Sequence, residues 1–325
     1  MRIAVTGASG FVGGAVARDA VAVGHEVWTF SRRDAGIAGA RHRTWDLAGG
    51  PLDAAPEVDA VVHAGAAVSD WCDLATARAT NVAGTRAVRE TFPDARFVHV
   101  SSGSVYDPFR PSVRAREAEA PVDRYLDAYG TTKAAAERYL ADDAASHPDR
   151  GGVVVLRPHA VYGPGDSTLL PRVEAAVRRG RLVLPGGGRV LQSLTHVDTL
   201  VAAVRAAVVL PEAVLRDGDA TTGTPGLLVA NVADAEPVVL RDALLDALHR
   251  RGTDVRVVAV PVRPAWALAG AVEAVARRLR RPDPPRLTRY ALSHLAMERT
   301  YDLAVLRDVL GVNPAPTNLA GAESW

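Results

Sequence analysis

Residues 2–14 read RIAVTGASGFVGG, and this stretch decides the fold. The short apolar run at its start is typical of a buried strand, and Gly7, Gly10 and Gly13 follow at once. The apolar spacing beyond them predicts a helix that ends near residue 23. A glycine turn that opens a helix lets backbone amide groups approach a pyrophosphate, and the helix dipole favours the anion. We therefore expect a dinucleotide site with contacts from Gly7, Gly10, Phe11, Val12 and Gly13.

The end of the second predicted strand indicates which dinucleotide is bound. HEVWTF at residues 25–30 is this strand, and its end should meet the adenosine ribose. NAD sites usually place an Asp or Glu there, whereas a ribose 2′-phosphate requires arginine. This chain has Ser31, Arg32 and Arg33 and no carboxylate. We expect NADP(H) rather than NAD(H); the alternative is that both arginines lie in a solvated loop.

Small and polar residues after the next two strands complete the predicted cofactor site. A third strand should end at residues 44–47, and AVVH at residues 60–63 is a fourth, followed by the small-residue turn 64–67. Small side chains there let a cofactor backbone pass closely. Asn81 is expected to open a helix and to bond backbone or ordered water near the site. The further cofactor contacts expected are Asp46 at the adenine, Leu47, Ala64, Gly65, Ala66 and Asn81.

A tyrosine and a lysine four residues apart are the strongest candidates for chemistry. YGTTK at residues 129–133 lies in a helix predicted from about residue 126 to 142, so Tyr129 and Lys133 share one face. Lys133 is the only lysine among 38 lysine and arginine residues. Arginine cannot replace a compact point charge on a flexible stem, because its guanidinium is planar and larger. The simpler interpretation, an exposed pair on a helix, does not explain why this one lysine is kept.

Serines follow the fifth predicted strand, RFVHV at residues 96–100. They belong to SSGSVY at residues 101–106, and the carboxyl ends of parallel strands are where such sheets bind ligands. One of these hydroxyl groups could polarise a substrate oxygen. Another buried strand is expected at residues 153–156, before the Pro- and Gly-rich crossing 157–166. His63 is expected to be packed and hydrogen-bonded rather than catalytic.

The pattern of strands and helices predicts an α/β fold with a doubly wound parallel sheet. The second half is less regular and contains no internal repeat, so we expect a smaller, partly interleaved C-terminal substrate region. The Rossmann unit should comprise residues 1–165 with 190–235 returning to it, and the substrate region 166–189 and 236–325. In the second half we expect a glycine turn at residues 186–188 and a strand at 227–231. Helices are expected near residues 170–179, 196–210, 240–251, 266–279 and 303–310.

Composition excludes several functions. The 38 basic and 37 acidic residues give a net charge of +1, so no global field attracts nucleic acid or a membrane. Cys72 is the only cysteine, which excludes an internal disulfide, provides no metal cluster and fits a reducing compartment. Met1 precedes a strand without a signal-peptide pattern, and we expect a cytoplasmic protein. Residues 264–281 are interrupted by charge and are too short to span a membrane, which leaves a surface-bound amphipathic helix or a packing helix.

Taken together, the motifs resemble the extended short-chain dehydrogenase/reductases. TGASGFVG, HAGAA, NVAGT, SSGSVY, YGTTK and LRPHAVYGPGD occur in that family's order and spacing over about residues 1 to 200. LRPHAVYGPGD and the looser NVADAEPVVLRDAL, PPRLTRYAL and YDLAVLRDVLG look most like the 3β-hydroxysteroid dehydrogenase-like branch. The likeness then extends nearly to the C-terminus.

The resemblance implies roles for individual residues. Tyr129 would be the acid/base, Lys133 would bind the nicotinamide ribose, and Ser102 would bind the substrate carbonyl. Ser102 is preferred to Ser101 because the family's serine lies three residues before the Val of VY. Pro158 would meet the carboxamide end of the nicotinamide. Many relatives dimerise through two helices, here expected to begin near residues 75 and 128, so a homodimer or a monomer is expected.

Three departures count against the closest alternative, a nucleotide-sugar epimerase or dehydratase. Gly103-Ser104 follows Ser102 where dehydratases carry Asp-Glu, Ala160 replaces an asparagine that contacts a sugar diphosphate, and an arginine of the RDFIHVDD pattern is absent. A third possibility, a sensor of NADP(H) without turnover, usually lacks the Tyr/Lys pair. We expect a reductase or dehydrogenase for a hydrophobic ketone or aldehyde and its alcohol, such as a steroid, terpenoid or polyketide. The expected pocket walls are Trp71, Ser104, Tyr106, His159 and Tyr162.

Overall fold

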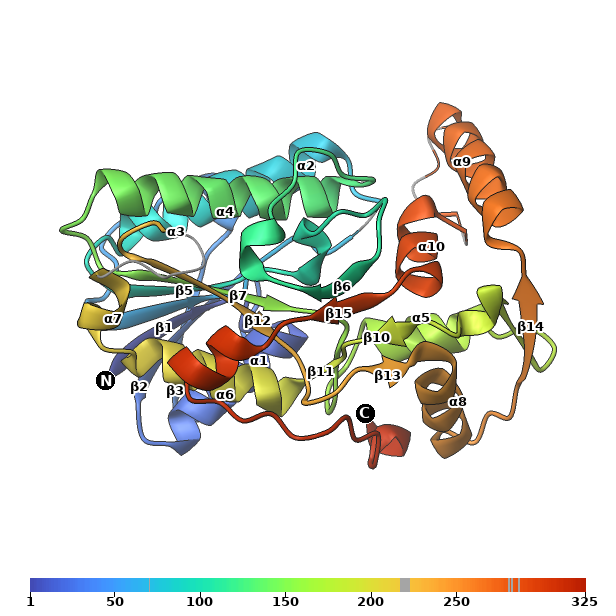
Figure 1. Cartoon of the computed structure of the whole chain (residues 1–325). Helices are drawn as coiled ribbons and strands as arrows, with labels where there is room; N and C mark the ends of the chain where they lie inside the picture. The colour runs from blue at the N-terminus through green and yellow to red at the C-terminus, as the bar shows by residue number, and fades with distance from the viewer. Residues whose placement is uncertain (70, 217–222, 280, 282, 286) are drawn as a thin grey trace.

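A parallel sheet forms the centre of the molecule and confirms the predicted doubly wound α/β fold (Figure 1). The computed structural model describes residues 1–325 except 70, 217–222, 280, 282 and 286. Within that part the sheet has seven strands, all paired in parallel. In spatial order they are β12 (Leu227–Val232), β7 (Val153–Pro158), β5 (Arg96–Val100), β4 (Ala60–His63), β1 (Arg2–Thr6), β2 (Glu26–Ser31) and β3 (Ala40–Thr44).

The chain changes direction across the sheet between β1 and β4. From β1 it moves outward through β2 to β3, and it then returns to β4 on the other side of β1. Thr6 pairs with His63, so the loops after these two strands leave the sheet side by side. Such a switch point, at the carboxyl ends of the strands, is where doubly wound sheets bind their ligands.

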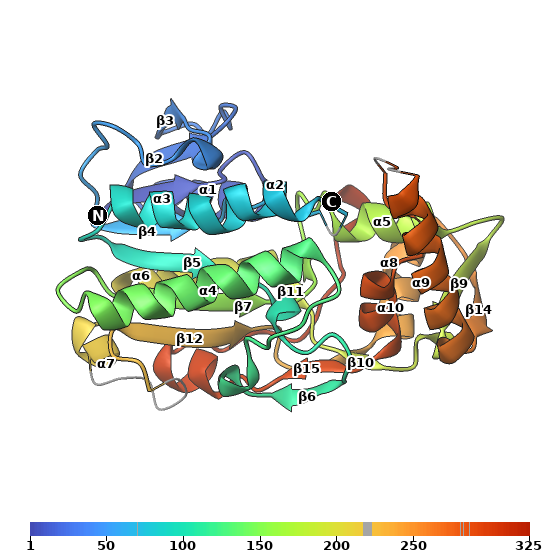
Figure 2. The ribbon, with the colours of Figure 1, turned by 90° about the horizontal axis from the view of Figure 1, so that it is seen from above.

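Helices cover both faces of the sheet (Figures 1 and 2). On one face α1 (Phe11–Ala22) and α6 (Val197–Val209) pack Val16 and Val204 against Ile3 and Val5 of β1. The other face carries α2 (Leu74–Arg78), α3 (Gly84–Thr91) and α4 (Ala128–Ser146). The side chains between the sheet and its helices are buried. The central strands therefore carry apolar residues on both faces, as a parallel sheet between two helix layers requires.

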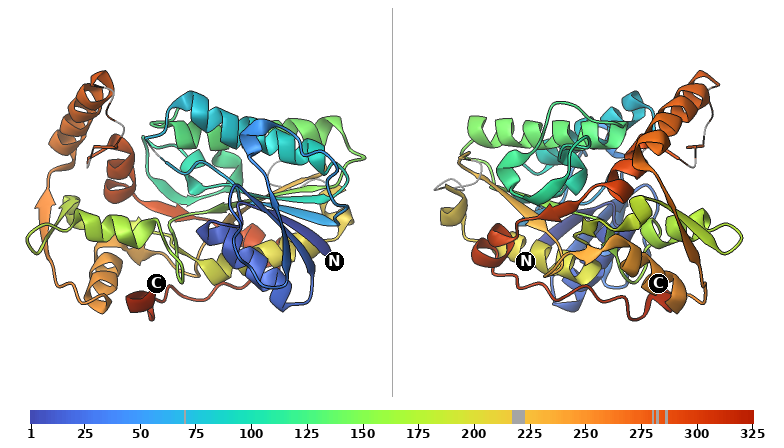
Figure 3. Two further views of the ribbon diagram at one scale, coloured as in Figure 1. Left: turned by 180° about the vertical axis from the view of Figure 1, so that it is seen from behind. Right: turned by 45° about the vertical axis from the view of Figure 1, so that its right-hand side comes forward.

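Shorter elements form a smaller region beside the sheet (Figure 3). A four-stranded sheet has the order β13 (Val238–Val239), β10 (Leu191–Gln192), β15 (Arg299–Tyr301) and β6 (Ser112–Ala115). Two further pairs are β14 (Arg256–Val260) with β9 (Arg181–Pro185), and β11 (Thr195–His196) with β8 (Val161–Tyr162). The helices are α5 (Leu169–Ala176), α8 (Leu240–Arg250), α9 (Val262–Arg278) and α10 (Arg289–Ala296), and α7 (Glu212–Arg216) lies beside the main sheet.

One sequence prediction about these elements is wrong, and several elements were not predicted. Asn81 does not open a helix, because the helix begins at α2, where Asp73 accepts from the Thr76 amide at 2.9 Å, and Asn81 lies in a π-helical turn between α2 and α3. The strands β6, β9, β14 and β15 and the helix α10 were not predicted. The strands among them have five residues or fewer, too short for a clear alternation of apolar and polar residues.

The basic segment near residue 270 forms α9, which projects from the body (Figure 3). Glu273 on its inner face accepts from the backbone amide of Arg289 at 2.6 Å and from its guanidinium at 2.9 Å, so α9 packs on α10. Leu268 and Val275 on the outer face are exposed. Among the described residues, no helix has the length and apolar character needed to cross a membrane.

Candidate active site

The glycine turn after β1 is packed too tightly for any larger residue. Gly7 has φ +70° and donates its amide to the Phe30 carbonyl at 2.8 Å. A Cβ on Gly7 would lie 2.6 Å from the backbone of Gly65, and a Cβ on Gly13 would lie 2.4 Å from the Gly7 carbonyl oxygen. The turn therefore meets the start of α1 and the loop after β4 through close backbone contacts.

This arrangement fits a dinucleotide. Gly10 caps α1 without a side-chain hydrogen bond, so the first-turn amides, which include those of Phe11 and Val12, remain for a ligand. The positive end of the helix dipole lies at the same place. Ala64 and Ala66, in the loop after β4, are half-buried and small. The glycine cradle and the uncapped helix suit a pyrophosphate of a nicotinamide dinucleotide.

Asn81 connects two walls of this region. Its Oδ1 accepts from the Ala67 amide at 2.7 Å, and its Nδ2 donates to the Ala67 carbonyl at 3.1 Å and to Thr132 Oγ1 at 2.9 Å. The backbone bond expected of Asn81 is therefore present. It fixes the loop after β4 against α4, the helix that carries the Tyr/Lys pair.

The end of β2 presents two unengaged cations. Arg32 and Arg33 are exposed, and neither side chain has a hydrogen bond or ion pair within the described part of the chain. Ser31 is buried and donates to the Arg33 carbonyl at 2.6 Å, which shapes the loop. Asp46 is exposed and caps a short helical turn through the Ala48 amide at 3.1 Å. Leu47 packs against the loop after β4.

Tyr129 and Ser102 come together, although they lie on different elements. Asp127 caps α4 by accepting from the Gly130 amide at 2.9 Å, and this cap sets the direction from which Tyr129 leaves the helix. The Tyr129 hydroxyl lies near Ser102, which follows β5. Burial raises the pKa of Tyr129, and the neighbouring Ser102 hydroxyl opposes that shift only in part. Tyr129 is therefore protonated at neutral pH and can donate to an oxygen held between the two hydroxyl groups.

Lys133 is buried one turn further along α4. It is 3% exposed, and its Nζ donates to the Val100 carbonyl at 2.7 Å at the end of β5. Burial lowers its pKa to about 8, and the charge of Glu137 opposes this shift. Lys133 does not contribute to the pKa shift of Tyr129.

A buried ion pair behind the site was missed by the sequence analysis. Glu137 is 4% exposed and Arg157 is 2% exposed, and Arg157 Nη2 donates to Glu137 Oε2 at 2.6 Å. Glu137 also accepts a short hydrogen bond from Ser101, the neighbour of Ser102. Pro158, which follows Arg157 at the end of β7, is buried beside Val232 of β12. The pair joins α4, β5 and β7 at the ends where the candidate catalytic residues lie.

The helix α10 adds a second group of residues that sequence reasoning missed. Tyr290 OH lies 3.1 Å from Ser104 Oγ, and the rings of Tyr290 and His294 meet edge to face at 4.5 Å. His294 stacks on His159 at 5.3 Å. His159 Nε2 lies 3.2 Å from Gln192 Oε1. Two expected pocket residues, Ser104 and His159, therefore contact one layer of side chains.

The other three expected pocket walls lie in different surroundings. Tyr106 is buried, and its hydroxyl donates to Asn231 Oδ1 at 2.7 Å. Tyr162 is buried among apolar residues that include the C-terminal segment, and it donates to Asp234 Oδ2 at 2.6 Å. Both rings are buried, and both hydroxyl groups are already engaged by these partners. Trp71 instead lines a cleft of about 510 Å³ beside the start of α4.

That cleft lies beside the first turn of α4, and its lining residues include neither Tyr129 nor Ser102. Its lining includes Asp127, Ala128 and Thr131 of α4 together with Trp71 and Arg277. The guanidinium of Arg277 lies 5.4 Å from the centre of the Trp71 ring, and the indole donates to the Arg281 carbonyl at 3.1 Å. The cleft combines an aromatic wall with cations, and it connects α9 to the helix of the Tyr/Lys pair.

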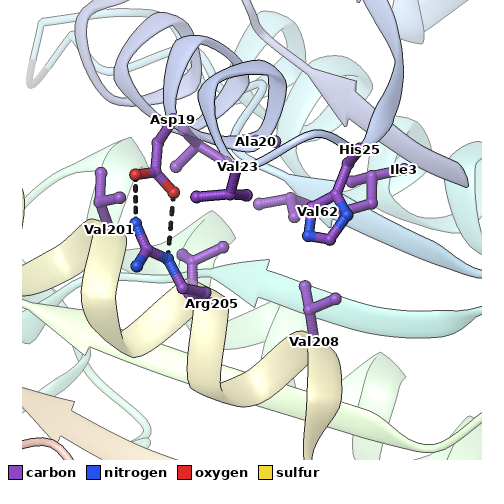
Figure 4. Close-up of a pocket in the computed structure, with 11 residues that line it drawn as sticks. Ile3, Asp19, Ala20, Val23, His25, Val62, Val201, Arg205 and Val208 are labelled. Carbon is purple, nitrogen blue, oxygen red and sulfur yellow. Dashed lines mark hydrogen bonds and ion pairs between the residues drawn. The ribbon is translucent and has the colours of Figure 1, made fainter. Parts of the chain in front are cut away.

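A second hollow is unrelated to the chemistry (Figure 4). It lies between α1 and α6, where Asp19 and Arg205 form an ion pair, and its volume of about 20 Å³ is near the space of one water molecule. The described residues contain no group of three or more His, Cys, Asp or Glu able to hold a metal ion. His63 is packed as predicted, because its ring bonds Thr6 at 2.7 Å and Thr85 at 2.9 Å, and burial lowers its pKa to about 3.

Comparison with known proteins defines the class. The sequence model of the NAD dependent epimerase/dehydratase family matches residues 3–219. The chain belongs to this family, the extended short-chain dehydrogenase/reductases, as its motifs predicted. Members of the family use a nicotinamide dinucleotide, which fits the glycine cradle.

Individual relatives narrow the type of enzyme. A 2-alkyl-3-oxoalkanoate reductase of Stenotrophomonas maltophilia (strain K279a) is 32% identical over 97% of this chain and 95% of that protein. A 4-hydroxy-2-methyl-3-oxo-4-farnesyl-3,4-dihydroquinoline-1-oxide ketoreductase of Stigmatella aurantiaca is 29% identical over 100% of this chain and 95% of that protein. The chain is an oxidoreductase that acts on a CH–OH/C=O pair. The solved structure of MoeE5 in complex with UDP-glucose and NAD has a TM-score of 0.71 at 23% identity over 100% of this chain and 97% of its own, which shows the shared fold.

Proposed function

We propose that this protein is an NADP(H)-dependent reductase of a ketone or aldehyde on a hydrophobic small molecule. The observation that carries the proposal is the approach of Tyr129 to Ser102, with Lys133 buried one turn further along α4 and bonded to the Val100 carbonyl at the end of β5. The 2-alkyl-3-oxoalkanoate reductase and the farnesyl-dihydroquinoline ketoreductase are named for ketone reduction on substrates with apolar chains, which supports the same class. We place the reacting carbonyl at Ser102 and Tyr129, where the loop after β5 meets the start of α4.

The chain's own residues would perform the proton half of the reaction. A bound NADPH supplies a hydride to the carbonyl carbon. Tyr129, protonated at neutral pH, donates its proton to the carbonyl oxygen as negative charge develops there. The Ser102 hydroxyl hydrogen-bonds the same oxygen and stabilises that charge. Lys133 would hold the nicotinamide ribose from α4 and supply positive charge near the phenol.

Replacement of Tyr129 by Phe tests the proposed proton donor. The variant keeps the ring and loses the hydroxyl group, so kcat for carbonyl reduction should fall by about 100-fold or more while NADPH binding persists. Consumption of NADPH at 340 nm with a panel of ketones measures turnover, and fluorescence titration measures binding. Tyr139→Phe, further along α4 where the ring meets Arg86, is the matched control and should behave as the unaltered enzyme. Equal turnover in Tyr129→Phe would refute the role, and conversion of UDP-sugars without net NADPH use would favour an epimerase.

The preference for NADP(H) depends on Arg32 and Arg33. Their side chains have no partner within the described chain, and no carboxylate stands at the end of β2, which supports a site for a 2′-phosphate. The double variant Arg32→Ala, Arg33→Ala should raise the dissociation constant for NADPH much more than that for NADH. Arg216→Ala, on α7, is the control for loss of positive charge. An unchanged ratio of the two constants would show that the 2′-phosphate is held elsewhere.

A further inference from the structure

The outer face of α9 is apolar and exposed. Leu268 and Val275 are each 58% exposed, and Leu279, which follows the helix, is 61% exposed. Residues four and seven positions apart share one face of a helix, so these three form a single stripe. A helix on a protein surface usually turns charged residues toward water. In α9 every exposed position between residues 264 and 276 is apolar: Pro264, Ala267, Leu268, Ala271, Ala274 and Val275.

The charged residue near the middle of α9 faces the protein instead. Glu273 is 6% exposed and accepts from the amide of Arg289 at 2.6 Å and from its guanidinium at 2.9 Å. Ala269 and Ala276, the other buried residues of the helix, lie on the same side. The helix is therefore fixed to α10 by one face and presents its apolar stripe outward. Contiguous exposed apolar surface of this kind marks a site of contact with a protein or a membrane.

Arginines lie at both ends of this stripe. Arg263 is exposed in the first turn of α9, and residues 277–281 read RRLRR at the other end. At a rise of 1.5 Å per residue, Arg263 and Arg278 are about 22 Å apart along the helix axis. The exposed side chains of Arg263, Arg278 and Arg281 form no ion pair within the described residues. The whole chain has a net charge of only +1, so this is a local concentration of positive charge.

A second basic group lies at the start of β14, the strand that leads into α9. Arg256 is paired in register with Arg181 of β9, and Arg178 and Arg179 come just before it. All four side chains are exposed, and none forms an ion pair in the part of the chain that the structure describes. Charges of one sign on neighbouring strands repel, and an external anionic surface would offset this repulsion. The strand and the helix both lie at the far edge of the smaller region (Figures 1 and 2).

We propose that α9 docks on an anionic lipid bilayer through its apolar stripe, with the two basic groups on the lipid headgroups. Helices that combine an apolar face with arginines bind at the boundary between headgroups and acyl chains. A second copy of the chain fits less well, because both ends of α9 are basic and two such faces would place like charges together. The docking does not depend on the proposed reduction, although a bilayer is where a hydrophobic substrate accumulates.

The test is sedimentation of the full chain with sucrose-loaded vesicles of phosphatidylcholine, with and without one third of phosphatidylglycerol. The anionic vesicles should bind at least about tenfold more tightly than the neutral ones, and high salt should weaken the binding. Leu268→Glu combined with Val275→Glu should lower the affinity at least roughly tenfold, because the stripe is then no longer apolar. Val209→Glu, at a valine of α6 that is 60% exposed, is the matched control and should keep it.

A charge variant and a fluorescent label test the two parts of the surface separately. Arg278→Gln should weaken binding to the anionic vesicles roughly fivefold, and Arg216→Gln on α7 should change it much less. Cys72 is the only cysteine, so Leu268→Cys in a Cys72→Ser background takes an environment-sensitive dye at one place. Its emission should shift to the blue with anionic vesicles, and the same dye at Val209→Cys should not shift.

The outcomes decide what covers the outer face of α9. Equal binding to both kinds of vesicle, full binding by the Leu268→Glu, Val275→Glu variant, or no shift of the dye at residue 268 would overturn the proposal. A lipid-free dimer that this variant dissociates in sedimentation velocity would show that a second copy covers the face, and would also overturn it. If the double variant loses its far-ultraviolet circular dichroism, Leu268→Ser decides. The vesicle measurements use neither cofactor nor ketone, so they stand even if the proposed reduction fails.

Discussion

Removing the charge of Glu137 should weaken the whole molecule, because it would leave a buried guanidinium without its counter-ion. Arg157 donates to Glu137 through Nε at 3.1 Å and through Nη2 at 2.6 Å, and both side chains are almost fully buried. Breaking one partner of a buried pair costs about 3–5 kcal/mol. Arg157 keeps bonds to the carbonyl groups of Glu117 at 2.8 Å and Ala120 at 2.9 Å, so we expect Glu137→Gln to lose about 3 kcal/mol, at the lower end of that range.

The measurement is urea unfolding followed by circular dichroism, with the free energy of unfolding taken at an unchanged m-value. Glu137→Leu combined with Arg157→Met should lose less than Glu137→Gln alone, because no unpaired charge is then buried. Asp246→Asn, which breaks the exposed pair with Arg250, is the control and should cost at most about 0.5 kcal/mol. A loss below about 1 kcal/mol in Glu137→Gln would refute the reasoning.

Four further predictions concern the cofactor turn and Lys133. Gly13→Ala should abolish NADPH binding, because its Cβ would lie 2.4 Å from the Gly7 carbonyl oxygen, while Gly270→Ala on α9 should leave fluorescence titrations unchanged. Since burial lowers the pKa of Lys133 from 10.5 to about 8, kcat/KM for reduction should fall as pH rises through about 8 and the ammonium is lost. The folded lysine binds fewer protons than the unfolded one between these values, so its contribution to the free energy of unfolding should rise with pH across that window. Lys133→Arg should remove the alkaline fall of kcat/KM, at a much lower rate, because a guanidinium stays charged.

The cofactor side of the site could be predicted from the sequence because its residues belong to patterns that span only a few positions. Gly7 and Gly13 stand where a strand passes into a helix, and the structure shows that their backbone contacts leave no room for a Cβ. Tyr129 and Lys133 share a helix face by their spacing alone. The lone lysine added a signal that does not depend on any neighbour in space.

The same reasoning failed where partners lie far apart in the chain. Thr300 accepts from the Arg114 amide at 2.8 Å across a separation of 186 residues, and the strands that carry them are too short to show a period. Arg299 is typical of a surface in sequence, yet it is buried and binds the loop around residue 110. Nothing local to these residues predicts such contacts. The apolar and aromatic character of Tyr106 and Tyr162 likewise suggested pocket walls, whereas their hydroxyl groups are closed off by Asn231 and Asp234.

Different parts of the chain should determine the reaction and the choice of substrate. The residues that would move the proton, Ser102 and Tyr129, lie on the Rossmann unit, and the buried Glu137–Arg157 pair holds Ser101, the neighbour of Ser102. Tyr290 of α10 lies 3.1 Å from Ser104 on the loop after β5, and α10 is anchored through α9 and through Gln192 of the short strand β10. A substitution on α10 can therefore change which molecule is held without moving the atoms that would do the chemistry. The specificity of this protein should respond to changes in the smaller region, while its reaction type should respond to changes at Ser102 and on the face of α4 that carries Tyr129 and Lys133.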